Sequence, residues 1–298
     1  MTVQRPEGLT VLVTGASGKT GRAVTRALLR RGVTVRAATR VPSQWTIDGA
    51  LPVPVDMESG DGLVAALTGV AAVYHMSPNM HPDEVPMAER LAQAVRDAEV
   101  PRLVFHSILH PHHPGMPHHL RKGHAEEILR KALPGTTVLR PGAYYQNLLA
   151  GALSGRILVP YRVDVPFTAI DLADVADVAA LVITDPEHAG CTYDLVGPET
   201  LTVAEQAEQA TAVLGRPVQV GSVSRDDWAA GTGADLREDA RADLLAMFAV
   251  YDAEGLTGDS TALPRLLGRP GRTWAQLLAA ACTPLAPAPP RRPNEEHQ

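Results

Sequence analysis

Hydrophobic positions in the first half of the chain follow two alternating patterns. Amphipathic spacing, with apolar residues three and four positions apart, predicts helices at Lys19–Arg31, Gly60–Leu67, Met87–Ala98 and Arg121–Lys131. Short runs that are apolar on both faces predict buried strands between them, at Leu9–Thr14, Thr34–Ala38, Leu51–Val55, Ala72–His75, Leu103–His106 and Thr136–Leu139. This alternation predicts an α/β fold built on a doubly wound parallel sheet of the Rossmann type, because parallel crossovers are right-handed.

The pattern changes after Pro141. Gly142–Asp164 reads as a long irregular stretch, and Asp171–Thr184 follows as a helix for which Asp171 supplies an N-cap. We expect this helix to return to the main sheet, followed by a strand at Cys191–Val196. Beyond it, a threonine cap predicts a helix over Thr202–Leu214.

A further strand is expected at Val218–Val223. Together with the change of pattern after Pro141, these elements predict two parts of unequal size. A nucleotide-binding domain covers residues 1–150, with 171–196 returning to it, and a smaller C-terminal α+β substrate-binding portion covers 151–170 and 197–282. Residues 283–298 are rich in proline, which sustains neither a helix nor a central strand, so a disordered tail is expected there.

Composition narrows the classes of function. The chain has 298 residues, is 45% hydrophobic and carries a formal charge of -6, which argues against a surface that neutralises nucleic-acid phosphates. No apolar run is long enough to span a membrane and no export signal is visible. The two cysteines, Cys191 and Cys282, form no disulfide framework and fit a reducing compartment, so the cytoplasm is the expected location.

A glycine-rich turn after the first strand is the strongest local signal. Gly15 permits a tight turn, Gly18 lets backbone N–H groups approach a pyrophosphate, and Gly21 lets the following helix pack on the strand. The sequence lacks the spacing of an ATP-binding P-loop, so a nicotinamide dinucleotide is favoured. The other residues expected to contact it from this turn are Ser17, Lys19 and Thr20.

The end of the second strand predicts which dinucleotide binds. An acidic residue there would hold a ribose 2′-hydroxyl, whereas this strand ends in Thr39 and Arg40. An arginine accommodates a 2′-phosphate, so NADP(H) is predicted over NAD(H); a merely solvated arginine is the alternative. Arg36 lies within the strand and is the less favoured contact.

Two further loops follow strands at the edge where ligands bind in open α/β sheets. Asp56 is expected to hydrogen-bond the adenine amino group with Met57 packing on the ring, although an N-cap for the helix near Gly60 explains Asp56 nearly as well. The Met76-Ser77-Pro78 segment is expected to pass over the nicotinamide ribose.

Several motifs together resemble the NmrA-like family of atypical short-chain dehydrogenase/reductases. Besides the glycine turn and Arg40, they are Val55-Asp56, Val104–Ser107, Lys122–Arg130, Leu139–Asn147 and Leu267–Trp274. The resemblance runs from about Val11 to Ala281 and implies an NADP-dependent reductase of quinones, dyes or isoflavonoid-type compounds. The same family includes regulators that bind the dinucleotide without doing chemistry.

The resemblance also implies catalytic residues, with a departure from ordinary short-chain dehydrogenases. Those enzymes use Tyr-x-x-x-Lys, whereas His118 stands four residues before Lys122 here. Lys122 is implied at the nicotinamide ribose. His118 is a candidate general acid, because an unperturbed imidazole pKa of about 6.5 suits proton exchange, or else a capping or partly exposed residue.

Two further positions are expected to face the substrate. Ser107 is a candidate contact for a substrate carbonyl, although a buried hydroxyl bonded to backbone accounts for it as well. Tyr144 and Tyr145 fall where the family lines its substrate pocket, and one of them is expected to donate a hydrogen bond; the alternative is simple packing.

Seven histidines lie between His106 and His124, which raises the question of a metal. They lack cysteine partners, a helical H-x-x-x-H face and nearby carboxylates, so no metal site is predicted. The proline-bearing loop among them is instead expected to form a mobile flap over the nicotinamide.

Three functions compete at this point. The leading hypothesis is an NADPH-dependent reductase that transfers hydride to a quinone, enone or related apolar or aromatic small molecule. The second is an NADP(H)-sensing regulator that acts through a protein partner, and the third is an isomerase or cyclase that retains its cofactor. The sequence leaves a homo-oligomer open and predicts neither a nucleic-acid nor a membrane partner.

Overall fold

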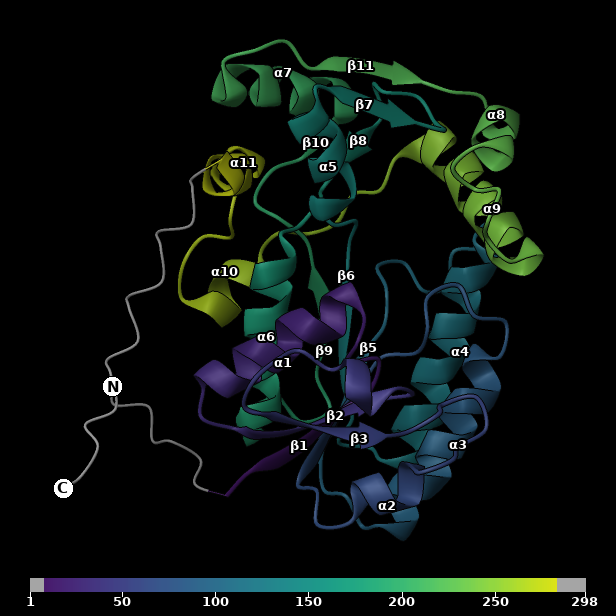
Figure 1. The fold of residues 1–298 in the computed structure, drawn as a ribbon, viewed down its shortest axis with the longest axis vertical. Helices are drawn as coiled ribbons and strands as arrows, with labels where there is room; N and C mark the ends of the chain where they lie inside the picture. The colour runs from purple at the N-terminus through teal and green to yellow at the C-terminus, as the bar shows by residue number, and fades with distance from the viewer. Residues whose placement is uncertain (1–7, 283–298) are drawn as a thin grey trace, which may run out of the picture.

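The computed structural model describes residues 8–282, and the predicted tail at 283–298 lies outside them. A seven-stranded parallel sheet forms its centre (Figure 1). In spatial order its strands are β3 (Ala50–Pro54), β2 (Thr34–Thr39), β1 (Thr10–Val13), β4 (Ala72–His75), β5 (Leu103–His106), β6 (Thr137–Pro141) and β9 (Thr192–Leu195). The strand order reverses between β1 and β4, so the predicted doubly wound Rossmann-type fold is confirmed.

Helices cover both faces of this sheet. On one face α1 (Lys19–Arg30) packs beside α6 (Leu172–Thr184), and together they bury one hydrophobic cluster against the strands. On the other face lie α2 (Leu63–Leu67), α3 (Glu84–Asp97) and α4 (Pro117–Ala132), which bury a second cluster. The Asp171 carboxylate accepts a hydrogen bond from the Ala173 amide, as its predicted capping role requires.

The remaining elements form a smaller region with its own hydrophobic cluster above the carboxyl edge of the sheet (Figure 1). Its helices are α5 (Gln146–Ser154), α7 (Val203–Leu214), α8 (Arg225–Ala230), α9 (Glu238–Glu254) and α11 (Trp274–Cys282). Its short strands pair as β7 (Arg156–Val159) with β11 (Gln219–Ser222) and β8 (Pro166–Phe167) with β10 (Leu201–Thr202). Helix α10 (Ala262–Leu267) packs on α6 and β9.

The expectation of an irregular stretch over Gly142–Asp164 is wrong, because α5 and β7 form there. A glycine inside α5 hides the helix from a propensity argument. Gly151 is needed at that position, since a Cβ atom would lie 2.8 Å from the Arg156 carbonyl oxygen as β7 turns back over the helix. The helix ends at Gly155 in the left-handed conformation, with φ of 87°.

Other element boundaries shift for local reasons. The helix predicted from Gly60 begins only at Leu63, because Gly60 and Gly62 both have positive φ. The helices predicted from Met87 and Arg121 begin earlier, at Glu84 and at Pro117. Proline is favoured at the first position of a helix, because its missing N–H would have no partner there.

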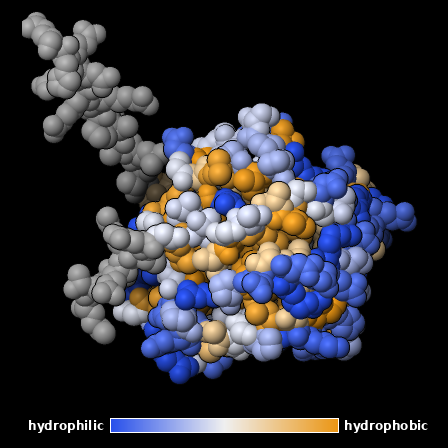
Figure 2. Space-filling view, turned by 90° about the horizontal axis from the view of Figure 1, so that it is seen from below, coloured by the Kyte–Doolittle hydropathy of each residue, from blue (hydrophilic) through white to orange (hydrophobic). Residues whose placement is uncertain are grey.

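One predicted strand is not buried on both faces. β3 forms the edge of the sheet, and 59% of its Leu51 is exposed. Val64 on the neighbouring α2 is 71% exposed. The view from below in Figure 2 shows hydrophobic residues at the surface among polar ones.

Candidate dinucleotide and substrate site

A cavity of about 970 Å³ lies over the carboxyl edge of the sheet. It begins at the glycine turn after β1 and passes the loops after β2, β3, β4, β5 and β6. Its far end lies in the smaller region, where aromatic and other apolar side chains line it: Tyr161, Phe167, Trp228, Leu244, Met247, Phe248 and Tyr251. One continuous space therefore joins the predicted nucleotide turn to an apolar chamber.

The glycine turn has the geometry of a pyrophosphate cradle. Gly15 has φ of 60°, and a Cβ atom on Gly21 would lie 2.2 Å from the Gly15 carbonyl oxygen, so the turn and α1 touch backbone to backbone. Gly18 caps α1 without a side-chain hydrogen bond and meets no atom closer than 3.4 Å at a Cβ position. The first amides of α1 therefore open toward the cavity, where an anion would be stabilised.

Two alanine substitutions separate the roles of these glycines. Gly18→Ala is expected to leave stability nearly unchanged and to weaken dinucleotide binding about tenfold, because the added methyl meets the ligand and not the protein. Gly21→Ala is expected to destabilise the fold itself by about 1–3 kcal/mol through overpacking. Titration calorimetry and urea unfolding measure the two effects, and equal binding by wild type and Gly18→Ala would contradict the cradle.

The loops after β2 and β3 meet at one end of the cavity. Thr39, Arg40, Asp56 and Met57 all line it. The Arg40 side chain is 72% exposed and lies 4.0 Å from the Glu58 carboxylate, so a guanidinium is available there but has an acidic neighbour. Glu58 also lines the cavity and was missed by the sequence reasoning, because nothing in its local pattern distinguishes it.

Asp56 and Arg36 both have structural partners. The Asp56 carboxylate accepts a hydrogen bond from the Glu58 amide at 2.8 Å, which closes a turn ahead of α2. The alternative of an N-cap for that helix is wrong, because Gly62 occupies the cap position. Arg36 donates to the carbonyl oxygens of Ala66 and Thr68, which leaves Arg40 as the basic residue of this strand end in the cavity.

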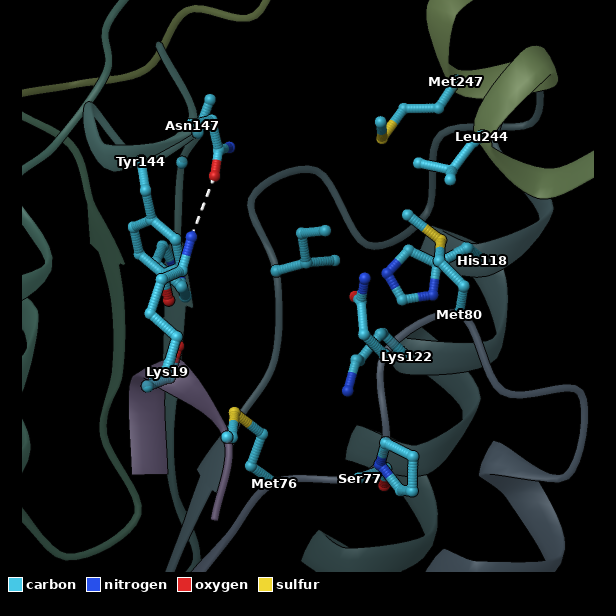
Figure 3. Close-up of a pocket in the computed structure, with 18 of the residues that line it drawn as sticks. Lys19, Met76, Ser77, Met80, His118, Lys122, Tyr144, Asn147, Leu244 and Met247 are labelled. Carbon is cyan, nitrogen blue, oxygen red and sulfur yellow. Dashed lines mark hydrogen bonds between the residues drawn. The ribbon is translucent and has the colours of Figure 1, made fainter. Parts of the chain in front are cut away.

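The loop after β4 is fixed by a buried threonine. The Thr14 hydroxyl donates to the Met76 carbonyl at 3.1 Å, and the Met76 amide lies 2.9 Å from the same hydroxyl. Ser77 is buried and its hydroxyl lies 3.2 Å from Nε2 of His75. Met76 and Ser77 consequently form a fixed wall of the cavity (Figure 3), which Pro78 also lines.

Lys122 lies in the cavity wall, paired with an acid that the sequence reasoning missed. Its Nζ donates to the Glu84 carboxylate at 3.0 Å and lies 5.5 Å from the centre of the Phe105 ring. Only 7% of the lysine side chain and none of the glutamate side chain is exposed. Glu84 stands in the first turn of α3, where acidic residues are common, so its buried role gave no signal.

His118 lies one helical turn before Lys122, and both side chains reach the cavity (Figure 3). Burial, followed by the nearby Lys122 charge, lowers the pKa of His118 to about 2. This direction of shift favours a neutral ring near pH 7 and argues against a general acid with an ordinary pKa. His118 is neither capping nor partly exposed, since it is 2% exposed and its Nδ1 has no hydrogen-bond partner among residues 8–282.

Ser107 lines the cavity, but its hydroxyl hydrogen is already donated to another side chain. The hydroxyl donates to the Glu126 carboxylate, which Arg140 holds through Nε at 2.9 Å and Nη2 at 2.5 Å. The predicted alternative of a backbone partner is thus replaced by a side-chain partner. Ser107 can accept a hydrogen bond from a ligand, but it does not offer one to a carbonyl oxygen.

The two adjacent tyrosines lie in different surroundings. Tyr144 lines the cavity, where the Lys19 ammonium lies 5.4 Å from its ring centre and donates to Asn147 at 3.1 Å (Figure 3). Tyr145 is buried, packs on Trp274 with ring centres 5.6 Å apart and does not line the cavity. Packing therefore explains Tyr145, and Tyr144 is the one of the two tyrosines that faces the cavity.

The histidine-rich segment does not form the predicted flap. His110 contacts the Thr257 carbonyl oxygen at 2.7 Å and His113 lies 3.3 Å from Glu254, which ties the segment to the smaller region. Neither histidine lines the cavity, so the expected position over the nicotinamide is wrong. Within residues 8–282 no three histidine, cysteine or acidic side chains are grouped to hold a metal ion.

The sheet reversal, the glycine turn and the cavity at the strand ends define an α/β protein built to bind a dinucleotide. Over residues 7–266 the chain matches the NmrA-like family, and it belongs to that family. The predicted family is therefore confirmed. Among residues 8–282, no helix is both long and apolar enough to cross a membrane.

Curated relatives match between 72% and 91% of the chain. It is 28% identical over 280 residues to an NAD(P)H azoreductase of Xenophilus azovorans, covering 91% of this chain and 97% of the relative. It is 29% identical over 277 residues to quinone oxidoreductase 2 of Escherichia coli, covering 89% and 96%. A reductase of (4-alkanoyl-5-oxo-2,5-dihydrofuran-3-yl)methyl phosphate from Streptomyces griseus is 33% identical over 224 residues, covering 72% of this chain and 78% of the relative.

Solved structures agree with this fold. The structure of the Escherichia coli NADPH-dependent quinone oxidoreductase complexed with NADPH superposes with a TM-score of 0.77 and 26% identity, covering 91% of this chain and 99% of the other. The triphenylmethane reductase of a Citrobacter species, complexed with NADP(H), gives a TM-score of 0.77 at 21% identity, covering 92% and 100%, and supports the fold alone.

Proposed function

We propose that this chain is an NADPH-dependent reductase of the atypical short-chain dehydrogenase/reductase type, acting on a quinone, enone or related conjugated small molecule. The observation that carries the proposal is the continuous cavity from the glycine turn to the apolar chamber. The named relatives are an NAD(P)H azoreductase, a quinone oxidoreductase and a reductase of a furanone-type phosphate. Their names support NAD(P)H-dependent oxidoreduction for this chain.

The residues present fit the cofactor. The α1 amides behind Gly18 would hold the pyrophosphate, Arg40 the 2′-phosphate and Lys122 the nicotinamide ribose. When bound, NADPH supplies a hydride at its nicotinamide ring. The protein supplies position and the exclusion of water, since Met76 and Ser77 form a wall of the cavity that Thr14 holds in place.

The chamber favours a flat, neutral acceptor. Tyr161 lies at the centre of an aromatic cluster, with ring centres 5.4 Å from Phe167, 5.9 Å from Phe248 and 5.7 Å from Tyr251. Such walls bind conjugated rings by stacking and apolar contact. A quinone also suits the neutral His118 ring, because its reduced oxygens take protons from water without a dedicated acid.

Binding and turnover measurements test the proposal. Arg40→Ala is expected to weaken NADPH binding by about tenfold or more and to leave NADH binding unchanged, because only NADPH carries the 2′-phosphate. Titration calorimetry with NADPH, NADP+, NADH and NAD+ measures this. Arg26→Ala is the matched control, since Arg26 is exposed and lies outside the cavity.

Turnover is followed by NADPH absorbance with a panel of quinones, enones and azo dyes. Reduction of at least one class is expected. Tight NADPH binding without turnover of any compound would contradict the reductase and favour the sensing regulator.

A further inference from the structure

Three side chains form a hydrogen-bonded row from the core of the sheet to the cavity. The Tyr74 hydroxyl on β4 lies 2.5 Å from Nδ1 of His106 on β5. Nε2 of the same imidazole lies 2.9 Å from the Tyr144 hydroxyl, which follows β6 and lines the cavity. Tyr74 has no exposed surface, and His106 is 5% exposed. The row therefore has a fully buried end at Tyr74 and reaches the cavity at His106 and Tyr144.

The buried end fixes where the hydrogen atoms lie. Burial, followed by the nearby Lys122 charge, lowers the pKa of His106 to about 3, so the ring is neutral and carries one N–H. Within the described residues, Nδ1 of His106 is the one hydrogen-bond partner of the Tyr74 hydroxyl. If Nδ1 carried the hydrogen, the buried Tyr74 O–H would be left without an acceptor, which is the costlier arrangement. Tyr74 therefore donates to Nδ1, and Nε2–H donates to Tyr144.

The open end is fixed as a consequence. The Tyr144 oxygen accepts from Nε2–H of His106. Burial nevertheless raises the pKa of Tyr144, so its hydrogen stays on. With its oxygen accepting from His106, the Tyr144 hydroxyl keeps its own hydrogen at the cavity wall, where it can be donated to a ligand.

We propose that Tyr74 and His106 are positioning residues that make the Tyr144 hydroxyl a hydrogen-bond donor to a neutral carbonyl oxygen in the cavity. This inference rests on the proposed reductase function, in which such an oxygen belongs either to the quinone or enone substrate or to the nicotinamide carboxamide. Tyr144 donates without giving up its proton, because replacing that proton along the row would leave a buried tyrosinate at Tyr74. In Figure 3 Tyr144 lies across the cavity from Lys122 and His118.

Nitrogen-15 spectra of the histidine rings test the row without any ligand. His106 is expected as the Nε2–H tautomer, with Nδ1 as the bare nitrogen, from pH 6 to pH 8. In Tyr74→Phe the tautomer preference is expected to weaken or reverse, because the donor to Nδ1 is gone. An Nδ1–H ring in the wild type would overturn the proposal whether or not the chain is a reductase.

A double-mutant cycle tests the consequence for the ligand. Tyr144→Phe is expected to lower either kcat/KM for the best quinone or enone, or the NADPH affinity, by about three- to tenfold, the worth of one neutral hydrogen bond. Loss in kcat/KM with unchanged NADPH affinity assigns the carbonyl to the substrate, and loss of NADPH affinity assigns it to the carboxamide. No loss in either would overturn the proposal.

The cycle also separates positioning from general structural damage. Tyr74→Phe is expected to reproduce most of the Tyr144→Phe loss and to have almost no further effect in the Tyr144→Phe background. Equal losses in both backgrounds would overturn the positioning role. Tyr193→Phe is the matched control, because its hydroxyl also bonds a histidine, His188 at 2.8 Å, but lies outside the cavity. If the wild type reduces no compound, the proposed function fails. The tautomer measurement needs no turnover, so it still tests the hydrogen-bonded row.

Discussion

Acidification from pH 7 to pH 5.5 is expected to lower the free energy of unfolding by roughly 5 kcal/mol. Four buried histidines cause this loss, because burial is the main reason that their pKa values fall to about 3 for His75, about 3 for His106, about 2 for His118 and about 4 for His119. The unfolded chain takes up these protons below pH 6.5, whereas the folded chain does not. Each histidine thus contributes stability that is present above pH 6.5 and is lost as the pH falls toward its folded value, at about 1.3 kcal/mol over this interval.

Urea unfolding at pH 7, 6.5, 6 and 5.5 measures this slope. His119→Gln is expected to remove about a quarter of the slope, and it does so without touching the cavity, which His119 does not line. His124→Gln on the same helix is the control, because His124 is exposed and its ring meets water in both states. Equal stability at pH 7 and pH 5.5 would contradict neutral burial of the four rings.

The sheet and its covering helices were predictable because their signals are local. Each buried strand is a short apolar run, each covering helix has its own apolar stripe, and the glycine turn lies between the first of each. Such signals need no knowledge of distant residues. Where a strand lies at the sheet edge, as β3 does, the same apolar pattern overstates burial, because the strand's own sequence does not reveal its position in the sheet.

The smaller region was harder to predict because its pairings join distant segments. β7 pairs with β11 some sixty residues later, as in the register of Arg156 with Gln219, and β8 and β10 are two residues long. Short strands of this kind carry no periodicity that a sequence argument can use. Gly151 then obscured α5, although the glycine is there because β7 crosses closely.

The candidate site shows the same division between local and distant signals. Gly15, Gly18 and Arg40 were found from their own motifs and do line the cavity, whereas Gly21 packs against the turn instead. Their partners were not found, because a charge pair such as Lys122 with Glu84 spans 38 residues and leaves no mark on either neighbourhood. The neutral state of His118 also depends on burial in the folded protein, which the spacing to Lys122 does not reveal.

Glu84→Gln is expected to destabilise the protein by about 3–5 kcal/mol, because it leaves the buried Lys122 ammonium without its countercharge. Lys122→Met is expected to have a similar cost, since the Glu84 carboxylate is fully buried and its second oxygen already lacks a hydrogen-bond partner within residues 8–282. The double variant is expected to recover most of the loss. Both positions then carry neutral side chains of similar size, so no buried charge is left unpaired as it is in each single variant.

Urea unfolding at pH 7 compares the four proteins. The control is Asp164→Asn, which breaks the Arg162–Asp164 pair at 2.8 Å but on the surface, where the side chains are 58% and 63% exposed. It is expected to change stability by less than about 1 kcal/mol. Strictly additive losses at Glu84 and Lys122 would mean that the two groups stabilise the fold independently. Lys122 would then be free to serve a bound ribose without Glu84 holding it in the cavity wall.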